Sequence, residues 1–187
     1  MRGAESFDER WPIGVRRRAL PCAPVRGSFL ICNAAWGAAE RLLGTYRDPD
    51  GDHEGIVFAL GRPAGADTHL ITTVVAPAAA TAPGRVHCDE RQMLAVTRAC
   101  RAHGLIVIAQ VHSHPGSSTV HSVGDDMMVF LPREDLLSIV VPHYAHRGAR
   151  PISTLGVHQF QDARWVRCDA DSVAETIRLI PDTIDLR

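Results

Sequence analysis

Residues 111–126 read Val-His-Ser-His-Pro-Gly-Ser-Ser-Thr-Val-His-Ser-Val-Gly-Asp-Asp, and this motif stretch decides how the rest of the chain is interpreted. It follows residues 104–110, a short apolar run rich in β-branched side chains, which predicts a buried strand. Side chains two positions apart on a strand share a face, so His112 and His114 project from one side of the strand's end. Pro115 cannot donate to a ladder, so the strand must stop there.

Two imidazoles placed in this way can bind one metal ion. Ser122 follows in the loop, and a carboxylate at Asp125 would complete a His-His-Asp set with a fourth position left for water, as catalytic zinc sites require. The residues alone leave alternatives open. The histidine pair also fits a polar strand end, His121 is a rival third ligand, and Ser122 with Asp125 also fits a helix capping box.

Composition narrows the class of protein. A chain of 187 residues with 45% apolar residues is expected to form one domain with a sizeable core. A net charge of −1 gives no field that would concentrate nucleic acid. With no apolar run near the roughly 18–20 residues of a membrane span and no signal-peptide segment, a cytoplasmic protein without a membrane partner is expected. Five cysteines without a Cys-x-x-Cys pair predict neither a disulfide framework nor a cysteine zinc site.

The pattern of elements predicts the fold class. Upstream of the motif we expect an N-terminal arm or edge strand over 1–27 with a strand at 15–20, a helix over 29–43 capped by Ser28, a hairpin of 54–60 with 68–75, a flexible loop over 76–84, and a helix from Asp89 to about 102 with Met93, Val96 and Cys100 inward. Downstream we expect a short helix over 125–131, a strand over 136–141, a hairpin of 152–160 with 165–168, and a C-terminal helix over 171–180. Helices before, between and after strands predict an α/β fold, a mixed sheet flanked by helices, in a single domain over 28–187.

The motif stretch also resembles a known family signature. His-x-His-Pro, six residues, Ser, two residues and Asp is the pattern of the MPN/JAMM metalloproteases, where a distant Glu precedes it; the matching residues are His112, His114, Pro115, Ser122 and Asp125. The resemblance covers about residues 28–168 and implies an MPN/JAB-type, cytidine-deaminase-like domain. It further implies one zinc ion per chain, bound by His112, His114 and Asp125, with the Ser122 hydroxyl donating to the oxyanion.

Hydrolysis at such a site needs a carboxylate outside the metal shell to move the water's proton. The resemblance implies a Glu on an upstream strand. Glu54 opens a predicted strand that ends in Ala-Leu-Gly and is the preferred candidate. Glu40 lies in Ala-Glu-Arg-Leu-Leu-Gly, which also looks like the family's pattern, but a helix would carry it away from the sheet and pairing with nearby arginines explains it. Glu90 reads as first-turn helix charge.

The family's activity sets the expected function. Its members hydrolyse peptide or isopeptide bonds after the C-terminal glycine of ubiquitin or a ubiquitin-like protein, which implies such a modifier, its conjugates and conjugation enzymes as partners. The sequence around the motif is similar to that of bacterial family members that accompany ubiquitin-like conjugation enzymes, including those of antiphage defence systems. The alternatives are a sulfur-carrier or amino-acid-adduct peptidase of the same fold, a catalytically inactive MPN scaffold, and a RadC-like relative. The intact motif argues against the scaffold, and the serine between the histidines, where RadC-like proteins have asparagine, argues against the last.

Overall fold

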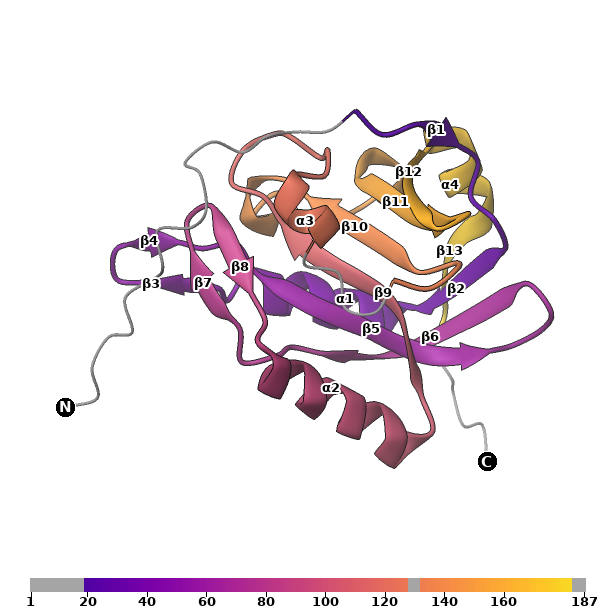
Figure 1. The fold of residues 1–187 in the computed structure, drawn as a ribbon, viewed down its shortest axis with the longest axis horizontal. Helices are drawn as coiled ribbons and strands as arrows, with labels where there is room; N and C mark the ends of the chain where they lie inside the picture. The colour runs from indigo at the N-terminus through magenta and orange to yellow at the C-terminus, as the bar shows by residue number, and fades with distance from the viewer. Residues whose placement is uncertain (1–18, 128–131, 183–187) are drawn as a thin grey trace.

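A computed structural model describes residues 19–127 and 132–182. Within them, one mixed sheet has the strand order β1-β12-β11-β10-β9-β5-β6-β2-β13 (Figure 1). Its strands are β1 Cys22–Ala23, β2 Ser28–Cys32, β5 Ile56–Pro63, β6 Thr68–Val75, β9 Ile106–Ser113, β10 Leu137–Val141, β11 Gly156–Gln161, β12 Arg164–Cys168 and β13 Ile177–Ile180. The α-helices are α1 Asn33–Leu43, α2 Glu90–His103, α3 Val123–Met127 and α4 Ala170–Thr176.

Smaller elements border the sheet. Two hairpins stand apart from it, one formed by β3 Arg47–Asp48 and β4 Gly51–Asp52, the other by β7 Ala80–Ala82 and β8 Arg85–His87. Two short 3₁₀ turns, η1 His143–Ala145 and η2 Ile152–Thr154, follow β10. The segment over 76–84, expected to be a flexible loop, therefore contains β7, because Ala80–Ala82 pairs with Arg85–His87 across a tight turn.

Helices cover both faces of the sheet, and β5 shows why. Its side chains alternate, so Val57 and Ala59 join the larger core cluster with α1, whereas Phe58 and Leu60 join a smaller cluster with α2. The predicted inward residues of α2, Met93, Val96 and Cys100, are buried in that smaller cluster. Asp89 caps α2 through a reciprocal capping box with Gln92, as predicted for the helix start. The expected α/β class with a mixed sheet flanked by helices is confirmed.

The helix expected over 29–43 is wrong in its first part. Residues 29–32 belong to strand β2, which pairs in parallel with β6, and the helix begins only at Asn33. Phe29 and Ile31 are buried on one face of that strand, and Ser28 is not a helix cap. Parallel pairing with a distant strand overrides the helical spacing of this short apolar run. The helix ends at Gly44, as expected.

The C-terminal helix expected over 171–180 is also only partly correct. Helix α4 ends at Thr176, and the chain continues as edge strand β13, parallel to β2. Ile177 is buried and lies opposite Phe29 in this pairing. The strand expected at 15–20 lies outside the described residues except for Ala19 and Leu20, which form no strand. The helix expected over 125–131 begins at Val123, and residues 128–131 lie outside the described part.

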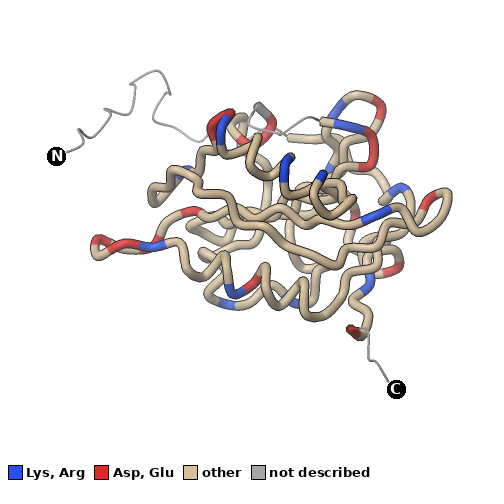
Figure 2. Tube along the Cα trace, turned by 90° about the horizontal axis from the view of Figure 1, so that it is seen from below, with Lys and Arg blue, Asp and Glu red and all other residues tan. Residues whose placement is uncertain are grey.

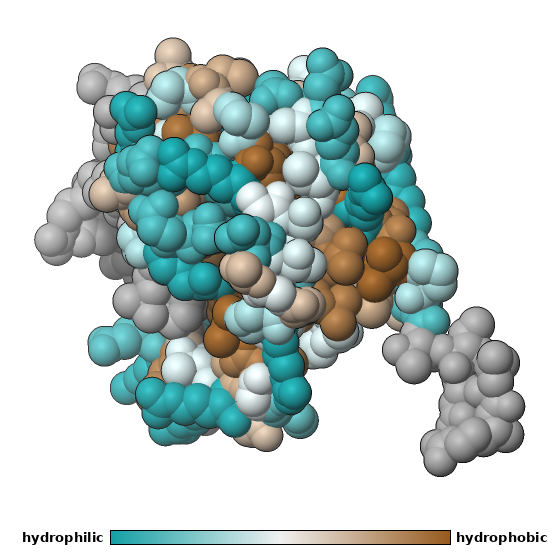
Figure 3. Space-filling model, turned by 90° about the vertical axis from the view of Figure 1, so that its right-hand side faces the viewer, coloured by the Kyte–Doolittle hydropathy of each residue, from teal (hydrophilic) through white to brown (hydrophobic). Residues whose placement is uncertain are grey.

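The surface carries both signs of charge. Along the trace of Figure 2, acidic and basic residues are interspersed, in agreement with the net charge of −1. The side shown in Figure 3 is mostly hydrophilic, with smaller apolar areas between. Among the described residues, no helix is long and apolar enough to cross a membrane. The five cysteines are free, and Cys22 is exposed.

Candidate metal centre and active site

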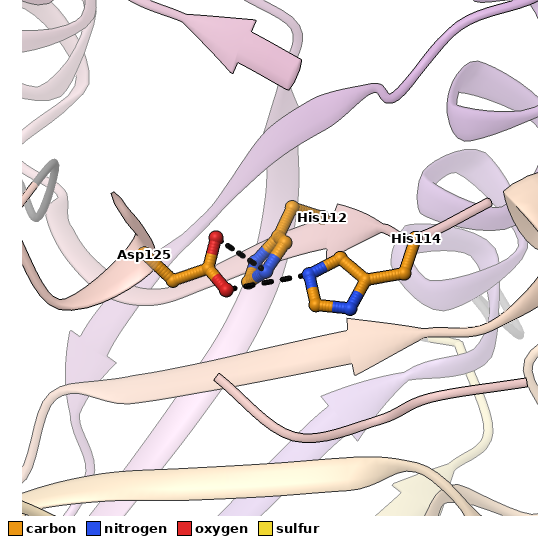
Figure 4. Close-up of side chains that lie close together, drawn as sticks. All are labelled: His112, His114 and Asp125. Atoms are coloured by element: carbon orange, nitrogen blue, oxygen red, sulfur yellow. Dashed lines mark ion pairs between the residues drawn. The ribbon is translucent and has the colours of Figure 1, made fainter. Parts of the chain in front are cut away.

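The two motif histidines lie at the end of β9, the middle strand of the sheet. His112 is held between strands on both sides, opposite Ile56 of antiparallel β5 and Val140 of parallel β10. Its side chain is 3% exposed, and His114 is 7% exposed. The chain then turns after Pro115 and returns as α3, which brings Asp125 to the same place (Figure 4). The predicted pair on one strand face is thus joined by the predicted carboxylate.

The spacing of these three side chains fits a metal ion. The Nε2 atom of His112 lies 3.4 Å from Asp125 Oδ1, and that of His114 lies 3.3 Å from Asp125 Oδ2. Charge-assisted hydrogen bonds are shorter, about 2.7–2.9 Å. Two ligand atoms, each about 2.0–2.1 Å from a tetrahedral zinc ion, would lie about 3.3–3.4 Å from each other, which is the spacing found here. The buried Nε2 of His112 has no hydrogen-bond partner, which fits a lone pair reserved for a metal.

Neighbouring groups hold His114 in the tautomer, and Asp125 in the ionised form, that bind a metal ion. The Nδ1 atom of His114 lies 3.2 Å from the carbonyl oxygen of Ser118, which can only accept, so Nδ1 carries the hydrogen and Nε2 presents its lone pair. Burial acts to raise the pKa of Asp125, but in the metal-free protein His112 and then His114, in their protonated forms, outweigh it and hold that pKa below its ordinary value. Asp125 is therefore a carboxylate at neutral pH, the form that binds metals.

Ser122 and Asp125 form the capping box that their spacing predicts. The backbone N–H of Ser122 donates to Asp125 Oδ2 at 2.6 Å, and the backbone N–H of Asp125 donates to Ser122 Oγ at 3.1 Å. The box orients the Asp125 carboxylate towards the histidines. Since Ser122 Oγ accepts in this arrangement, its own hydrogen remains available for donation.

His121, the rival third ligand, faces a different set of partners. Its Nδ1 lies 2.9 Å from Asp126 Oδ1, and its Nε2 lies 2.9 Å from Ser138 Oγ. Ser138 Oγ in turn accepts from Gln110 Nε2 at 2.9 Å. A carboxylate accepts, so Nδ1 carries the hydrogen, and Nε2 accepts from the Ser138 hydroxyl. Both nitrogens are occupied, and burial lowers the pKa of His121, which agrees with a neutral ring.

This chain of buried polar groups ties the motif loop to β9 and β10, and it was not foreseen. Gln110 and Ser138 interrupt apolar runs that were expected to be buried strands. Buried polar side chains are nearly always hydrogen-bonded, so their presence in such runs is a signal for a polar partner. The sequence does not identify that partner, because His121 reaches Ser138, and through it Gln110, only after the chain has turned back over the sheet.

Glu54 lies beside the metal-binding group but outside it. It lies two residues before β5 rather than opening the strand as expected, and the antiparallel pairing of Ile56 with His112 brings this point of the chain to the end of β9. Its backbone N–H donates to the carbonyl of Ala82 in the β7–β8 hairpin at 3.0 Å. The residue is 9% exposed, and burial raises its pKa to about 7; His114 opposes this effect and Asp125 adds to it.

The two other glutamates have structural surroundings. Glu40 lies on α1, where Oε1 accepts from the backbone N–H of Ala149 at 2.9 Å and Oε2 accepts from Arg150 Nε at 3.2 Å. The Glu40 carboxylate therefore binds the distant loop at Ala149 and Arg150 instead of the arginines near it in sequence, with which pairing was expected. Glu90 lies in the first turn of α2, as expected for helix charge.

In the metal-free protein, Glu54 should make stability depend on pH. Its pKa rises from 4.5 in the unfolded chain to about 7 in the folded protein, so between these values the folded state binds more protons. The free energy of unfolding therefore falls as pH rises through this window. Glu54→Gln should stabilise chelator-treated protein by about 2–3 kcal/mol at pH 8 and by almost nothing at pH 4, measured by urea unfolding. An equal difference at both pH values would contradict the raised pKa.

Comparison with known proteins identifies the family. Residues 41–154 match a family model described as prokaryotic homologs of the JAB domain. Because the match spans more than half of the chain, the protein belongs to the JAB domain family, in agreement with the motif resemblance. The solution structure of protein DSY2949 from Desulfitobacterium hafniense has a similar fold, with TM-score 0.53 and 16% identity over 82% of this chain and 94% of that chain. A search of curated proteins finds no match.

Proposed function

We propose that this protein is a zinc-dependent peptidase or isopeptidase that cleaves after the C-terminal glycine of a ubiquitin-like modifier. The JAB domain family includes the JAMM metalloproteases and suggests a peptidase-type function. The observation that carries the proposal is Glu54, a buried carboxyl group with its pKa raised to about 7, beside the candidate ligands but not among them. A ligand set alone serves a structural metal equally well, whereas hydrolysis also needs a separate proton carrier.

In this proposal each residue has a distinct role. His112, His114 and Asp125 would hold zinc, which when bound would activate a water molecule and polarise the scissile carbonyl. The Glu54 carboxylate would take up a proton and then return it to the leaving amine. The Ser122 hydroxyl, whose hydrogen the capping box leaves available, would donate to the oxyanion that develops on the carbonyl oxygen.

The surroundings of Glu54 favour an extended substrate. The β7–β8 hairpin is a two-stranded sheet next to Glu54, bonded to it through Ala82, and the Tyr144 hydroxyl donates to Pro83 of the same hairpin at 2.6 Å. A modifier's glycine-ending tail could add to an open edge of this hairpin as a further strand, held by backbone hydrogen bonds. The proposed partners are the modifier, its conjugates and conjugation enzymes. The proposed link to a bacterial antiphage system rests on the amino-acid sequence around the motif.

A cleavage panel tests the function. Ubiquitin-like proteins fused to a reporter should be cut after the terminal glycine, and fusions truncated just before those glycines should lose at least about 100-fold in kcat/KM, since the reacting carbonyl is no longer positioned. A zinc chelator should abolish cleavage, and added zinc should restore it. Equal turnover of unrelated peptides would indicate a general peptidase. Hydrolysis of sulfur-carrier or amino-acid adducts alone would favour the alternative peptidase, and bound zinc without any turnover would indicate an inactive scaffold.

A further inference from the structure

Ser113, the residue between the two candidate ligands, contacts the backbone that carries Glu54. Its side chain is completely buried. Ser113 Oγ accepts from the backbone N–H of Gly55 at 2.9 Å, and the backbone N–H of Ser113 donates to the Gly55 carbonyl at 3.0 Å. The Gly55 N–H belongs to the peptide group that joins Glu54 to Gly55. The residue flanked by the ligands is therefore hydrogen-bonded to the peptide plane that directly follows Glu54.

The Tyr46 ring packs against Gly55. A Cβ atom on Gly55 would collide with the ring of Tyr46, so the aromatic ring occupies the space of the missing side chain. The Tyr46 hydroxyl donates to the carbonyl of Ile56 at 2.8 Å. Together with the bond from the Glu54 N–H to Ala82, these contacts hold residues 54–56 from three separate segments. Beside the pairing of Ile56 with His112, the Ser113 side chain thus links the Glu54–Gly55 peptide group to the strand that carries His112.

We propose that Ser113 is a positioning residue for Glu54, which couples the proton-carrying carboxylate to the ligand strand. The inference rests on the proposed function of Glu54 as the proton carrier. Proton transfer needs heavy atoms within about 2.6–3.2 Å, and a displacement of about 1 Å can cost on the order of 10²-fold in rate. Without the Ser113 hydroxyl, the Glu54–Gly55 peptide loses its acceptor and can rotate, and the rotation moves the Glu54 side chain. The candidate ligands, on β9, directly after it and on α3, keep their places.

Ser113→Ala should therefore separate turnover from metal binding. We expect kcat for a ubiquitin-like fusion to fall about 10- to 100-fold, with KM and zinc content within twofold of the parent. Ser113→Thr keeps the Oγ acceptor and should recover most of the loss. The matched control is Ser172→Ala, because Ser172 Oγ also accepts a backbone N–H, that of Val25 at 3.0 Å, and lies on α4 rather than at the site. An equal fall in kcat in the control would overturn the inference.

Two further readouts distinguish positioning from general destabilisation. In a Glu54→Gln background, Ser113→Ala should reduce the residual rate by less than twofold, because its effect acts through Glu54. A full additional 10- to 100-fold loss would overturn the inference. Independently of activity, the Gly55 amide should exchange its hydrogen at least about tenfold faster in Ser113→Ala than in the parent, while unchanged exchange would refute the contact. If the parent cleaves no fusion, the proposed function fails, and amide exchange still decides the coupling.

Discussion

Replacing His114 by alanine should remove most of the zinc from the purified protein and abolish measurable hydrolysis. The parent should contain close to one equivalent per chain, because the described residues form one group of three side chains that could hold a metal ion. A two-ligand remnant cannot complete the tetrahedral set, and the lost imidazole is one whose lone pair is oriented by Ser118. Elemental analysis of metal content, followed by turnover of one fusion substrate, provides the measurement. Asp125→Ala should behave in the same way.

His121→Ala is the matched control for the metal prediction. His121 belongs to the same motif stretch as the candidate ligands, but its two ring nitrogens are hydrogen-bonded to Asp126 and Ser138. Its loss should leave zinc in place and instead lower the free energy of unfolding by about 2–4 kcal/mol, since a fully buried ring and two hydrogen bonds disappear. If His121→Ala strips the metal while Asp125→Ala does not, the assigned ligand set is wrong.

Glu54→Gln should lose about 10²–10⁴ in turnover and retain its zinc. The amide keeps the size of the side chain but cannot take up a proton, and Glu54 is not one of the three ligands. The loss should appear in kcat more than in KM, because the proton is transferred only on the way to the transition state. Metal content is measured first, and then turnover of the same fusion substrate.

Glu40→Gln tests the competing assignment. The Glu40 carboxylate binds the loop at Ala149 and Arg150, so its replacement should reduce stability modestly and leave turnover within a few-fold of the parent. Near-normal turnover of Glu54→Gln together with a collapse in Glu40→Gln would reverse the assignment of the proton carrier.

Patterns among residues close in sequence were sufficient to predict several parts of the site and of the fold. Strand alternation places His112 and His114 on one face, and the capping box of Ser122 with Asp125 depends only on residues three apart. Strand β6 and the start of α2 also follow from short-range patterns, a run rich in β-branched residues after a turn and the cap at Asp89. These features were predictable because the atoms that determine them are neighbours in sequence.

Segments 29–32 and 177–180 were not predictable in the same way. Each is a short apolar run next to a helix, and periodicity over four residues does not distinguish a helical turn from a buried strand. They become β2 and β13 because they pair with each other in parallel, Ile177 opposite Phe29, although 148 positions separate these two residues. The energy that decides their structure comes from a partner far away in sequence.

The same distinction holds for the chemistry of the site. The motif in the sequence determined which histidines and which aspartate could bind a metal, and its pattern favoured Glu54 over Glu40. Only the tertiary structure decided that His121 is engaged elsewhere, because Ser138, itself hydrogen-bonded by Gln110, reaches His121 from the sheet. Likewise, the raised pKa of Glu54 is caused mainly by burial, which exists only when β5, β9 and the β7–β8 hairpin have come together. Residue identity and spacing are local properties, whereas desolvation and hydrogen-bond partnership are properties of the packed protein.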